Sequence, residues 1–344
     1  GMIKARPPKY RSGKKVAVIG SGPAGLAAAQ QLNRKGHYVT VFEKDNKPGG
    51  LLRYGIPNFK LSKHVIDRRL EILMEEGIEF VTNTEIGRDI PGKQIMQEYD
   101  AVCLATGAGK PRDINPVGRE LKGIHFAMEF LSQQIRLLQG EEAFTAEKIS
   151  AKDKHVLVIG GGDTGSDCVG TSIRQGAKSV TQIEILPQPP LGKNPATPWP
   201  HPYPQILKTS SSHEEGCIRR WLLNTLSFVG EDGSVKEATA EEVAWEKDEN
   251  GRFRMISRGQ KETLKADLIL LALGFVHPVH EGLLDELGVD YDARGNVAVD
   301  KQHGSNIPGV FAAGDTIMGA SLVVKAIASG RKVAEDIHRV ISTR

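Results

Sequence analysis

Cysteine is scarce in this sequence. Only Cys103, Cys168 and Cys217 occur among 344 residues, and no two of them are neighbours along the chain. The absence of a CxxC motif excludes dithiol redox chemistry, and an iron–sulfur cluster normally takes four thiolate ligands. We therefore expect three buried or idle thiols, and no iron–sulfur cluster held by this chain alone.

Charge of one sign and long apolar runs are also lacking. The net charge is only +3 and is spread along the chain, which does not favour a nucleic-acid partner. The longest apolar runs, such as residues 268–275, are far shorter than the roughly 20 residues that cross a bilayer. Because no secretory signal is visible, we expect a cytoplasmic protein. His277 and His280 lack further ligands at useful spacing, so no metal site is expected.

Glycine, in contrast, is abundant at 38 residues, and two glycine turns each follow a β-branched run. The first turn comprises Gly20, Ser21, Gly22, Pro23, Ala24 and Gly25, and the second comprises Gly160, Gly161, Gly162, Asp163, Thr164 and Gly165. Glycines in a GxGxxG turn allow a tight reversal, close approach of a pyrophosphate and close packing of the next helix. The N-terminus of that helix offers N–H groups and a positive dipole to phosphate. The sequence therefore predicts two dinucleotide sites.

An acidic residue is expected to end each unit by binding a ribose. The predicted strand 38–42 leads into Glu43, and the predicted strand 179–183 leads into Glu184. Glu43 is thus predicted to bind the adenosine ribose of the first dinucleotide, and Glu184 that of the second. The alternative is that either residue is an exposed charge at a strand end.

The repeat extends beyond the glycine turns. Residues 99–107 and 266–274 each read as a buried strand that ends in a small-residue turn. A third signature, residues 309–315, has no glycine turn of its own, so its strand is predicted to return to the first domain. We therefore expect an α/β chain of two Rossmann-like domains, one inserted in the other. The predicted boundaries are 1–13 for a linker or tag remnant, 14–150 and 285–344 for the first domain, and 151–284 for the inserted one.

Longer strings of this sequence resemble the small (beta) subunit of glutamate synthase. They are residues 14–25, 39–44, 48–57, 160–174, 182–187 and 321–324. The resemblance covers essentially the whole chain and implies a pyridine nucleotide-disulfide reductase-like architecture without the redox disulfide. It implies FAD in the first domain and NAD(P)H in the inserted domain, with hydride passing from the nicotinamide to the flavin. Electrons would then pass through iron–sulfur clusters to a large subunit that makes glutamate from glutamine and 2-oxoglutarate.

In that family a cysteine-rich N-terminal domain helps to bind the clusters, and this sequence has no such domain. Residues 6–13 resemble the linker that follows it, and Gly1 before Met2 resembles a remnant of tag removal. We therefore expect a shortened chain that starts at the linker. Its partners would be the iron–sulfur domain and the large subunit.

The resemblance also extends the set of predicted site residues. The predicted FAD contacts are Gly20, Gly22, Pro23, Ala24, Gly25, Glu43, Lys44, Gly50, Leu51, Arg53, Ala105, Thr106, Gly107, Gly314, Asp315, Ser321 and Leu322. The predicted NAD(P) contacts are Gly160, Gly161, Gly162, Asp163, Thr164, Gly165, Glu184 and Gly274. Leu322 is predicted to begin a helix whose N–H groups stabilise negative charge on reduced flavin. Arg53 could instead be a surface cation, and Asp315 could be a helix N-cap, a role that can coexist with a flavin contact.

No catalytic acid, base or nucleophile is predicted, because hydride transfer needs only two bound rings held at close range. Glu184 is followed by Ile185 and Leu186 rather than by an arginine pair, which favours NADH, while Arg174 and Lys178 keep NADPH open. Two alternatives remain for the function: a free-standing NAD(P)H:acceptor reductase and a nucleotide-binding scaffold without turnover.

Overall fold

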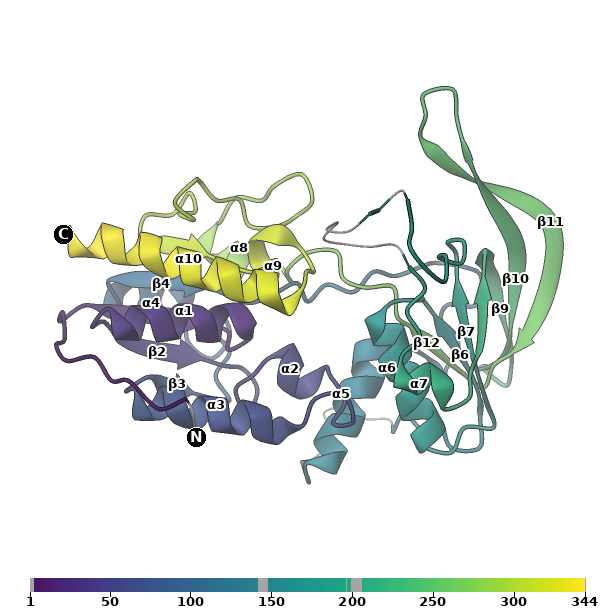
Figure 1. The fold of residues 1–344 in the computed structure, drawn as a ribbon, viewed down its shortest axis with the longest axis horizontal. Coiled ribbons are helices and arrows are strands. Elements are labelled where there is room, and N and C mark those ends of the chain that lie inside the picture. Colours follow the sequence, from purple (N-terminus) through teal and green to yellow (C-terminus); the bar gives the residue numbers. More distant parts are fainter. Residues whose placement is uncertain (1–2, 142–147, 196, 199–205, 344) are drawn as a thin grey trace. The chain divides into compact units, whose positions relative to one another are not determined.

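The computed structural model describes residues 3–141, 148–195, 197–198 and 206–343 (Figure 1). Residues 1–2, part of the predicted tag remnant, lie outside the described residues. The chain divides into two compact units: unit 1 is Gly1–Arg112 with Phe275–Arg344, and unit 2 is Asp113–Gly274. Among the helices in the described ranges, none is both long enough and apolar enough to cross a membrane.

Unit 1 is built on a parallel five-stranded sheet. Its strands, in their order across the sheet, are β13 (Val310–Ala312), β4 (Ala101–Leu104), β1 (Lys15–Ile19), β2 (Tyr38–Phe42) and β3 (Glu79–Val81). The inner strands are rich in valine and are buried on both faces, as parallel strands covered by helices are. Strand β13 pairs with β4, which confirms the prediction that the strand after residue 309 returns to the first sheet.

Helices pack on both faces of this sheet. They are α1 (Pro23–Arg34), α2 (Leu51–Tyr54), α3 (Lys63–Glu75), α4 (Gly92–Glu98), α8 (Leu283–Leu287), α9 (Asp315–Met318) and α10 (Val323–Ser342). Helix α10 runs alongside α1 in Figure 1. The two helices approach so closely that a Cβ on Gly330 would lie 2.1 Å from the Ala24 carbonyl oxygen. Helix α1 therefore starts at a fixed place against the sheet and α10.

Unit 2 repeats the parallel sheet but covers it differently. Its strands lie in the order β5 (Ile124–Phe126), β12 (Leu268–Leu271), β6 (His155–Ile159), β7 (Ser179–Glu184) and β8 (Ile218–Trp221). The helices α5 (Ala127–Leu138) and α6 (Asp163–Arg174) share an apolar core with one face of this sheet, and α7 (Ser211–Glu214) lies beside α6. An antiparallel sheet of β9 (Leu223–Glu231), β10 (Ser234–Lys247) and β11 (Phe253–Lys265) packs its apolar residues against the other face.

The antiparallel sheet is absent from the sequence-based expectations. Its signal was nevertheless present, because Asp232 and Gly233 join β9 to β10, and Asp-Gly between apolar runs is a strong hairpin signal. Both residues have positive φ, 51° and 74°, as the tight hairpin turn requires. Figure 1 draws β10 and β11 as a long curved hairpin.

The unit boundaries differ from the predicted ones at 150/151 and 284/285. Residues 113–141 and 148–150 belong to unit 2, because β5 hydrogen-bonds to β12 and extends the second sheet. Residues 275–284 belong to unit 1, where Val276 donates its backbone N–H to the Lys110 carbonyl at 2.8 Å. The first boundary was missed because β5 has only three residues and precedes the rest of its sheet in the chain.

Candidate functional site

The first glycine turn leads from β1 into α1, and two of its glycines are required by close backbone packing. A Cβ on Gly20, whose φ is +103°, would lie 2.4 Å from the Ala105 carbonyl oxygen, and one on Gly25 would lie 1.9 Å from the Gly20 carbonyl oxygen. Gly22 is different, since its φ is −66° and an added Cβ would meet nothing within 4 Å. The space beside Gly22 is therefore open.

The open side of the turn meets the start of α1. Gly22 is the N-cap and has no side chain that could accept from the first-turn N–H groups, and Pro23 at the first helical position has no N–H to donate. The first helical bond runs from the Leu26 N–H to the Gly22 carbonyl at 3.0 Å, so the N–H groups of Ala24 and Gly25 have no acceptor within the helix. A helix start of this kind, beside an open glycine, fits the pyrophosphate of FAD.

Glu43, which directly follows β2, hydrogen-bonds to the same turn. Its side chain is buried at 5% exposure, which excludes the alternative of an exposed strand-end charge. Oε2 accepts hydrogen bonds from the Ser21 N–H at 3.2 Å and from the Ser21 hydroxyl, while Oε1 accepts from the Asp45 N–H at 2.9 Å. Oε2 already accepts two hydrogen bonds, but Oε1 accepts only this one and can accept another, so binding of a ribose hydroxyl by Glu43 stays compatible with these contacts.

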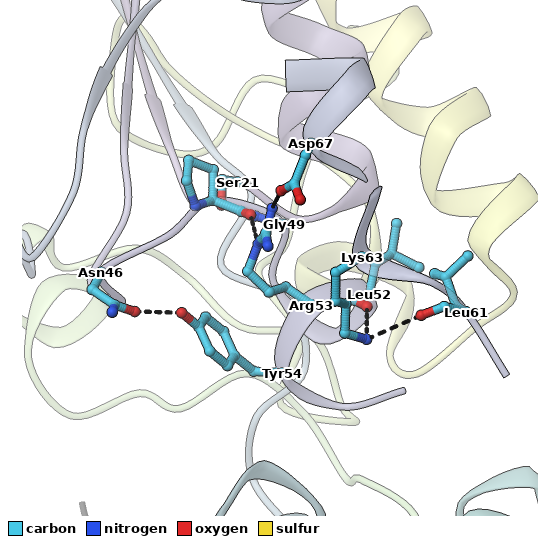
Figure 2. Close-up of polar contacts among 10 residues, drawn as sticks. Ser21, Asn46, Gly49, Leu52, Arg53, Tyr54, Leu61, Lys63 and Asp67 are labelled. Atoms are coloured by element: carbon cyan, nitrogen blue, oxygen red, sulfur yellow. Dashed lines mark hydrogen bonds and ion pairs between the residues drawn. The ribbon is translucent and has the colours of Figure 1, made fainter. Parts of the chain in front are cut away.

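A second loop packs against the glycine turn. The Gly49 N–H donates to the Ser21 hydroxyl at 2.8 Å (Figure 2), and a Cβ on Gly50 would lie 2.9 Å from the Gly22 Cα. Gly50 therefore lies beside the open part of the turn. Leu51, at the start of α2, leaves 47% of its surface exposed, and Lys44 is also exposed.

Arg53 is buried in this loop at 2% exposure, which excludes the surface-cation alternative. Its Nε donates to the Pro48 carbonyl at 2.6 Å, and its Nη2 pairs with Asp67 Oδ1 at 2.5 Å (Figure 2). On the other side of α2, Lys63 donates to the Leu52 carbonyl at 3.0 Å. The structure thus gives Arg53 a role in fixing the loop, and its contact with FAD stays a prediction.

The carboxyl ends of β4 and β13 supply a third group of predicted residues. The Gly107 N–H donates to the Thr316 hydroxyl at 2.9 Å, and the hydroxyls of Thr106 and Thr316 lie 3.4 Å apart. The buried Thr316 was not predicted, although its place directly after the Gly314-Asp315 pair was a usable signal. The alternative that Asp315 is a helix N-cap is wrong, because Gly314 caps α9 and Asp315 is its first residue.

The start of α10 lies as expected. Leu322 is its N-cap and Val323 its first residue, which confirms the predicted helix start. Ser321 donates its hydroxyl hydrogen bond to Asp315 Oδ1 at 2.6 Å, which ties this helix start to α9. Leu322 and Val323 remain 45% and 42% exposed, so they offer apolar surface that a flavin ring could cover.

Unit 1 therefore brings its predicted residues to one edge of the sheet. Gly20 lies beside Ala105, Gly22 beside Gly50, and a Cβ on Gly314 would lie 2.5 Å from the Ala24 Cβ. Ligands of open α/β sheets bind at the carboxyl ends of the strands, which is the edge where these residues meet.

The second glycine turn repeats the first. A Cβ on Gly160, whose φ is +122°, would lie 2.3 Å from the Ala272 carbonyl oxygen, and one on Gly165 would lie 2.3 Å from the Gly160 carbonyl oxygen. Gly162 again has an ordinary φ of −78°, no side-chain cap and nothing within 4 Å of an added Cβ. Asp163 and Thr164 follow in the first turn of α6, and both remain accessible to solvent. The second turn therefore leaves the same open space beside its third glycine and the helix start that follows. We call this open turn with its helix start a cradle for a dinucleotide.

Glu184 hydrogen-bonds to the second turn as Glu43 does to the first. Its Oε2 accepts from the Gly161 N–H at 2.7 Å, and its Oε1 accepts from the Leu186 N–H at 3.1 Å. A side chain on Gly161 would collide with this carboxylate, since its Cβ would lie 2.6 Å from Oε2. Gly274, at the end of β12, has a φ of +81° and open space where a Cβ would be, as does Gly107 in the first repeat.

Arg174 and Lys178 are the two cations that left NADPH possible as the cofactor. Each lies at the end of its helix or strand that is far from the glycine turn and Glu184. Arg174 is the last residue of α6, about 18 Å along the helix from Gly162, and it pairs with Glu215 at 2.8 Å. Lys178 precedes β7, a strand of about 20 Å that ends at Glu184. Arg174 thus lies far from Gly162, and Lys178 far from Glu184.

Each of the three thiols has a raised pKa and is therefore poorly ionised. Cys103 and Cys168 are fully buried, and burial raises the pKa of Cys103 to about 12 and that of Cys168 well above its usual value. Burial also raises the pKa of the half-buried Cys217. All three are free, and no cluster of metal-binding side chains occurs among the residues that the structure describes.

Comparison with known proteins agrees with this geometry. The family model of the pyridine nucleotide-disulphide oxidoreductases matches residues 14–195 and 232–330. The chain is 48% identical to the glutamate synthase [NADPH] small chain of Mycobacterium tuberculosis, over 99% of this chain and 70% of that protein. It belongs to the glutamate synthase small-chain family. The resemblance found in the sequence is thereby confirmed, and with it an FAD-dependent, NAD(P)H-oxidising enzyme with an electron-transfer role in glutamate synthase.

The chain is also similar to a second protein and to a solved structure. A glutamate synthase [NADH] of Schizosaccharomyces pombe is 46% identical over 98% of this chain and 16% of its own length. Among solved structures, FprA of Mycobacterium tuberculosis, a His57Gln mutant, superposes with a TM-score of 0.74 at 17% identity, covering 98% of this chain and 85% of that one. This similarity shows the shared fold and confirms the predicted fold class.

Proposed function

We propose that this member of the small-chain family oxidises NADH at the second glycine turn and passes the electrons to FAD bound at the first. The observation that carries the proposal is the duplicated cradle, in which Gly22 and Gly162 are open while Glu43 and Glu184 hold the turns. FAD, when bound, accepts a hydride and can release its electrons one at a time.

The residues of unit 1 would hold FAD without acid–base chemistry. The N–H groups of Ala24 and Gly25 donate to phosphate, and Glu43 accepts from the adenosine ribose. Gly314, which lies next to Ala24 in the first turn of α1, and Asp315 would border the ribityl-phosphate region. Leu322 with its neighbours covers apolar ring surface and excludes water there.

NADH is proposed over NADPH on electrostatic grounds. The Glu184 carboxylate repels a 2′-phosphate and accepts from a free 2′-hydroxyl. The cations Arg174 and Lys178 lie at the opposite ends of α6 and β7 and cannot neutralise that repulsion. The names of the relatives do not decide, since the relative from M. tuberculosis is named for NADPH and that from S. pombe for NADH.

The next electron carrier is proposed to lie outside this chain. Its three cysteines are single and free, and two of them are fully buried in β4 and α6. Four accessible thiolates, as a cluster needs, are therefore not available here. We propose an iron–sulfur domain and a large subunit as the partners that take the electrons onward.

Anaerobic titration with NADH and then NADPH, followed by the visible spectrum, tests this proposal. We expect flavin absorption bands without broad iron–sulfur absorption, and we expect NADH to bleach them. In rate assays, the kcat/KM for NADH should be higher than that for NADPH. Protein that binds no flavin would overturn the proposal, and a strong preference for NADPH would overturn the role of Glu184. Flavin that neither nucleotide reduces would indicate a scaffold. Rapid turnover with a small physiological acceptor would indicate a free-standing reductase.

A further inference from the structure

A chain of hydrogen-bonded side chains runs behind the second glycine turn and plays no part in the proposed function so far. Gln182 on β7 donates from Nε2 to the Gly160 carbonyl at 2.9 Å. Its Oε1 lies 3.0 Å from His213 Nε2, and His213 Nδ1 accepts from the Ser210 N–H at 3.1 Å. The chain therefore connects α7 with the first residue of the nucleotide turn.

The two backbone groups at the ends of this chain fix its direction. A carbonyl at Gly160 can only accept, so the Gln182 amide must turn its NH₂ group towards it and its oxygen towards His213. The N–H of Ser210 can only donate, so His213 Nδ1 must be the acceptor and Nε2 must carry the proton. One tautomer and one amide orientation satisfy every member; Gln182 is buried at 2% exposure, while Ser210 and His213 are partly exposed.

The surroundings of the chain make the contact with Gly160 tight. A Cβ on Gly165 would lie 2.6 Å from Gln182 Nε2, so the glycine at this position admits the amide as well as the helix. The hydroxyls of Ser166 on α6 and Ser210 lie 2.5 Å apart, which joins α7 to the helix that starts from the turn. Both sides of the turn are thus held from β7, its carbonyl by Gln182 and its Gly161 N–H by Glu184.

The first glycine turn has no such chain among its described residues. In the pairing of β1 with β2, Val18 lies opposite Val41, whereas in the pairing of β6 with β7 the corresponding Val158 lies opposite Gln182. Valine donates no hydrogen bond, so no side chain at this position holds the Gly20 carbonyl. The extra support is specific to the turn at which we propose that NADH binds.

We propose that His213 is a positioning residue for NADH, which acts through Gln182 to hold the second glycine turn in its binding conformation. The inference rests on the proposed function, since it presumes that this turn binds NADH. His213 itself touches no nucleotide in this proposal. By orienting the Gln182 amide, it fixes the Gly160 peptide and, through it, the direction of the N–H groups that follow.

Two substitutions interrupt the chain at different links. His213→Gln keeps a side chain that can cap Ser210, because glutamine at the third helical position is a standard capping-box residue, but it removes the ring nitrogen that faces Gln182. Gln182→Met keeps the length of the side chain and removes its donor. The matched control is His155→Gln, since His155 bonds the Ser179 hydroxyl at 2.8 Å at the far end of β6 and β7.

The measurement is the dissociation constant of NADH and of ADP-ribose for the FAD-loaded chain, together with Tm and the rate of flavin reduction at saturating NADH. Each single variant should bind both nucleotides about 3- to 10-fold more weakly, the effect of one lost hydrogen bond. The saturated rate and the FAD content should be unchanged. The His155→Gln control should bind like the wild type.

A double variant separates positioning from general destabilisation. If His213 acts through Gln182, the double variant should bind no more weakly than Gln182→Met alone. Additive losses in the double variant, or wild-type affinity in both single variants, would overturn the inference while leaving the proposed function intact. Wild-type protein that binds neither NADH nor ADP-ribose would overturn the proposed function itself.

Discussion

Replacing Gly22 by alanine should separate FAD binding from folding. Gly22 has φ −66° and ψ −178°, a conformation that alanine adopts without strain, and the new Cβ would meet nothing within 4 Å. The substitution should therefore leave the protein folded. The added methyl group would, however, occupy the space through which a phosphate approaches the N–H groups of α1. We expect a folded protein that binds FAD poorly.

The sizes of the two effects differ clearly. Loss of glycine freedom in the unfolded chain stabilises by about 0.4–1 kcal/mol, and the poorer N-cap preference of alanine offsets part of this. The free energy of unfolding should thus change by less than about 1 kcal/mol. Displacing the phosphate from one charge-assisted hydrogen bond costs about 1.5–3 kcal/mol, which weakens FAD binding roughly 10- to 150-fold.

The assay is reconstitution of apoprotein with FAD, followed by flavin fluorescence, with thermal melting of the same samples. Gly162→Ala is the matched partner and should keep FAD affinity while it weakens NADH binding. Gly25→Ala should instead fail to fold normally, because its Cβ would lie 1.9 Å from the Gly20 carbonyl oxygen. Unchanged FAD affinity in Gly22→Ala would refute the assignment of this turn. A fall in the Tm of Gly22→Ala by more than about 5 °C would refute the inference that the space beside Gly22 is open.

Three further predictions concern charge. Glu184→Gln removes the repulsion of a 2′-phosphate, so the kcat/KM ratio of NADPH to NADH should rise at least about fivefold, and a constant ratio would contradict this. Asp67→Asn leaves the buried Arg53 guanidinium without its anion, so urea unfolding should show a loss of about 1–3 kcal/mol rather than none. Burial, together with the nearby His338, lowers the pKa of His37 to about 4, so the folded protein binds fewer protons than the unfolded chain between pH 6.5 and 4. Stability should fall as pH drops through that window, and His37→Gln should flatten the pH dependence of Tm there.

The cradles were predictable because their signals are local. A β-branched strand, a glycine turn and an acid at the end of the next strand all lie within about 30 residues, the size of one βαβ unit. The predicted helix start at Leu322 and the return of β13 to the first sheet relied on equally short patterns. Glu43 and Glu184 were found for the same reason, and the structure adds that they hold the turns.

The residues that sequence reasoning missed depend on contacts between distant segments. His213 faces Gln182 across 31 positions, and nothing in a short serine-rich stretch indicates that partner. Thr316 lies 209 positions from the Gly107 N–H that it accepts. The three-residue strand β5 was too short for its alternation to be read, which displaced the predicted unit boundary. Tertiary pairing, rather than local propensity, decided each of these.

The hydrogen bonds by which Glu43 and Glu184 hold the two turns have a consequence for the rate at which the dinucleotides bind. Ordering a loop residue costs about 1–2 kcal/mol of backbone entropy, and these carboxylates meet that cost during folding, before any nucleotide arrives. Each cradle is thus preorganised, and little of the interaction with phosphate is lost to loop ordering. Association of either dinucleotide should be a single fast phase, with no slow isomerisation of the turn after the encounter.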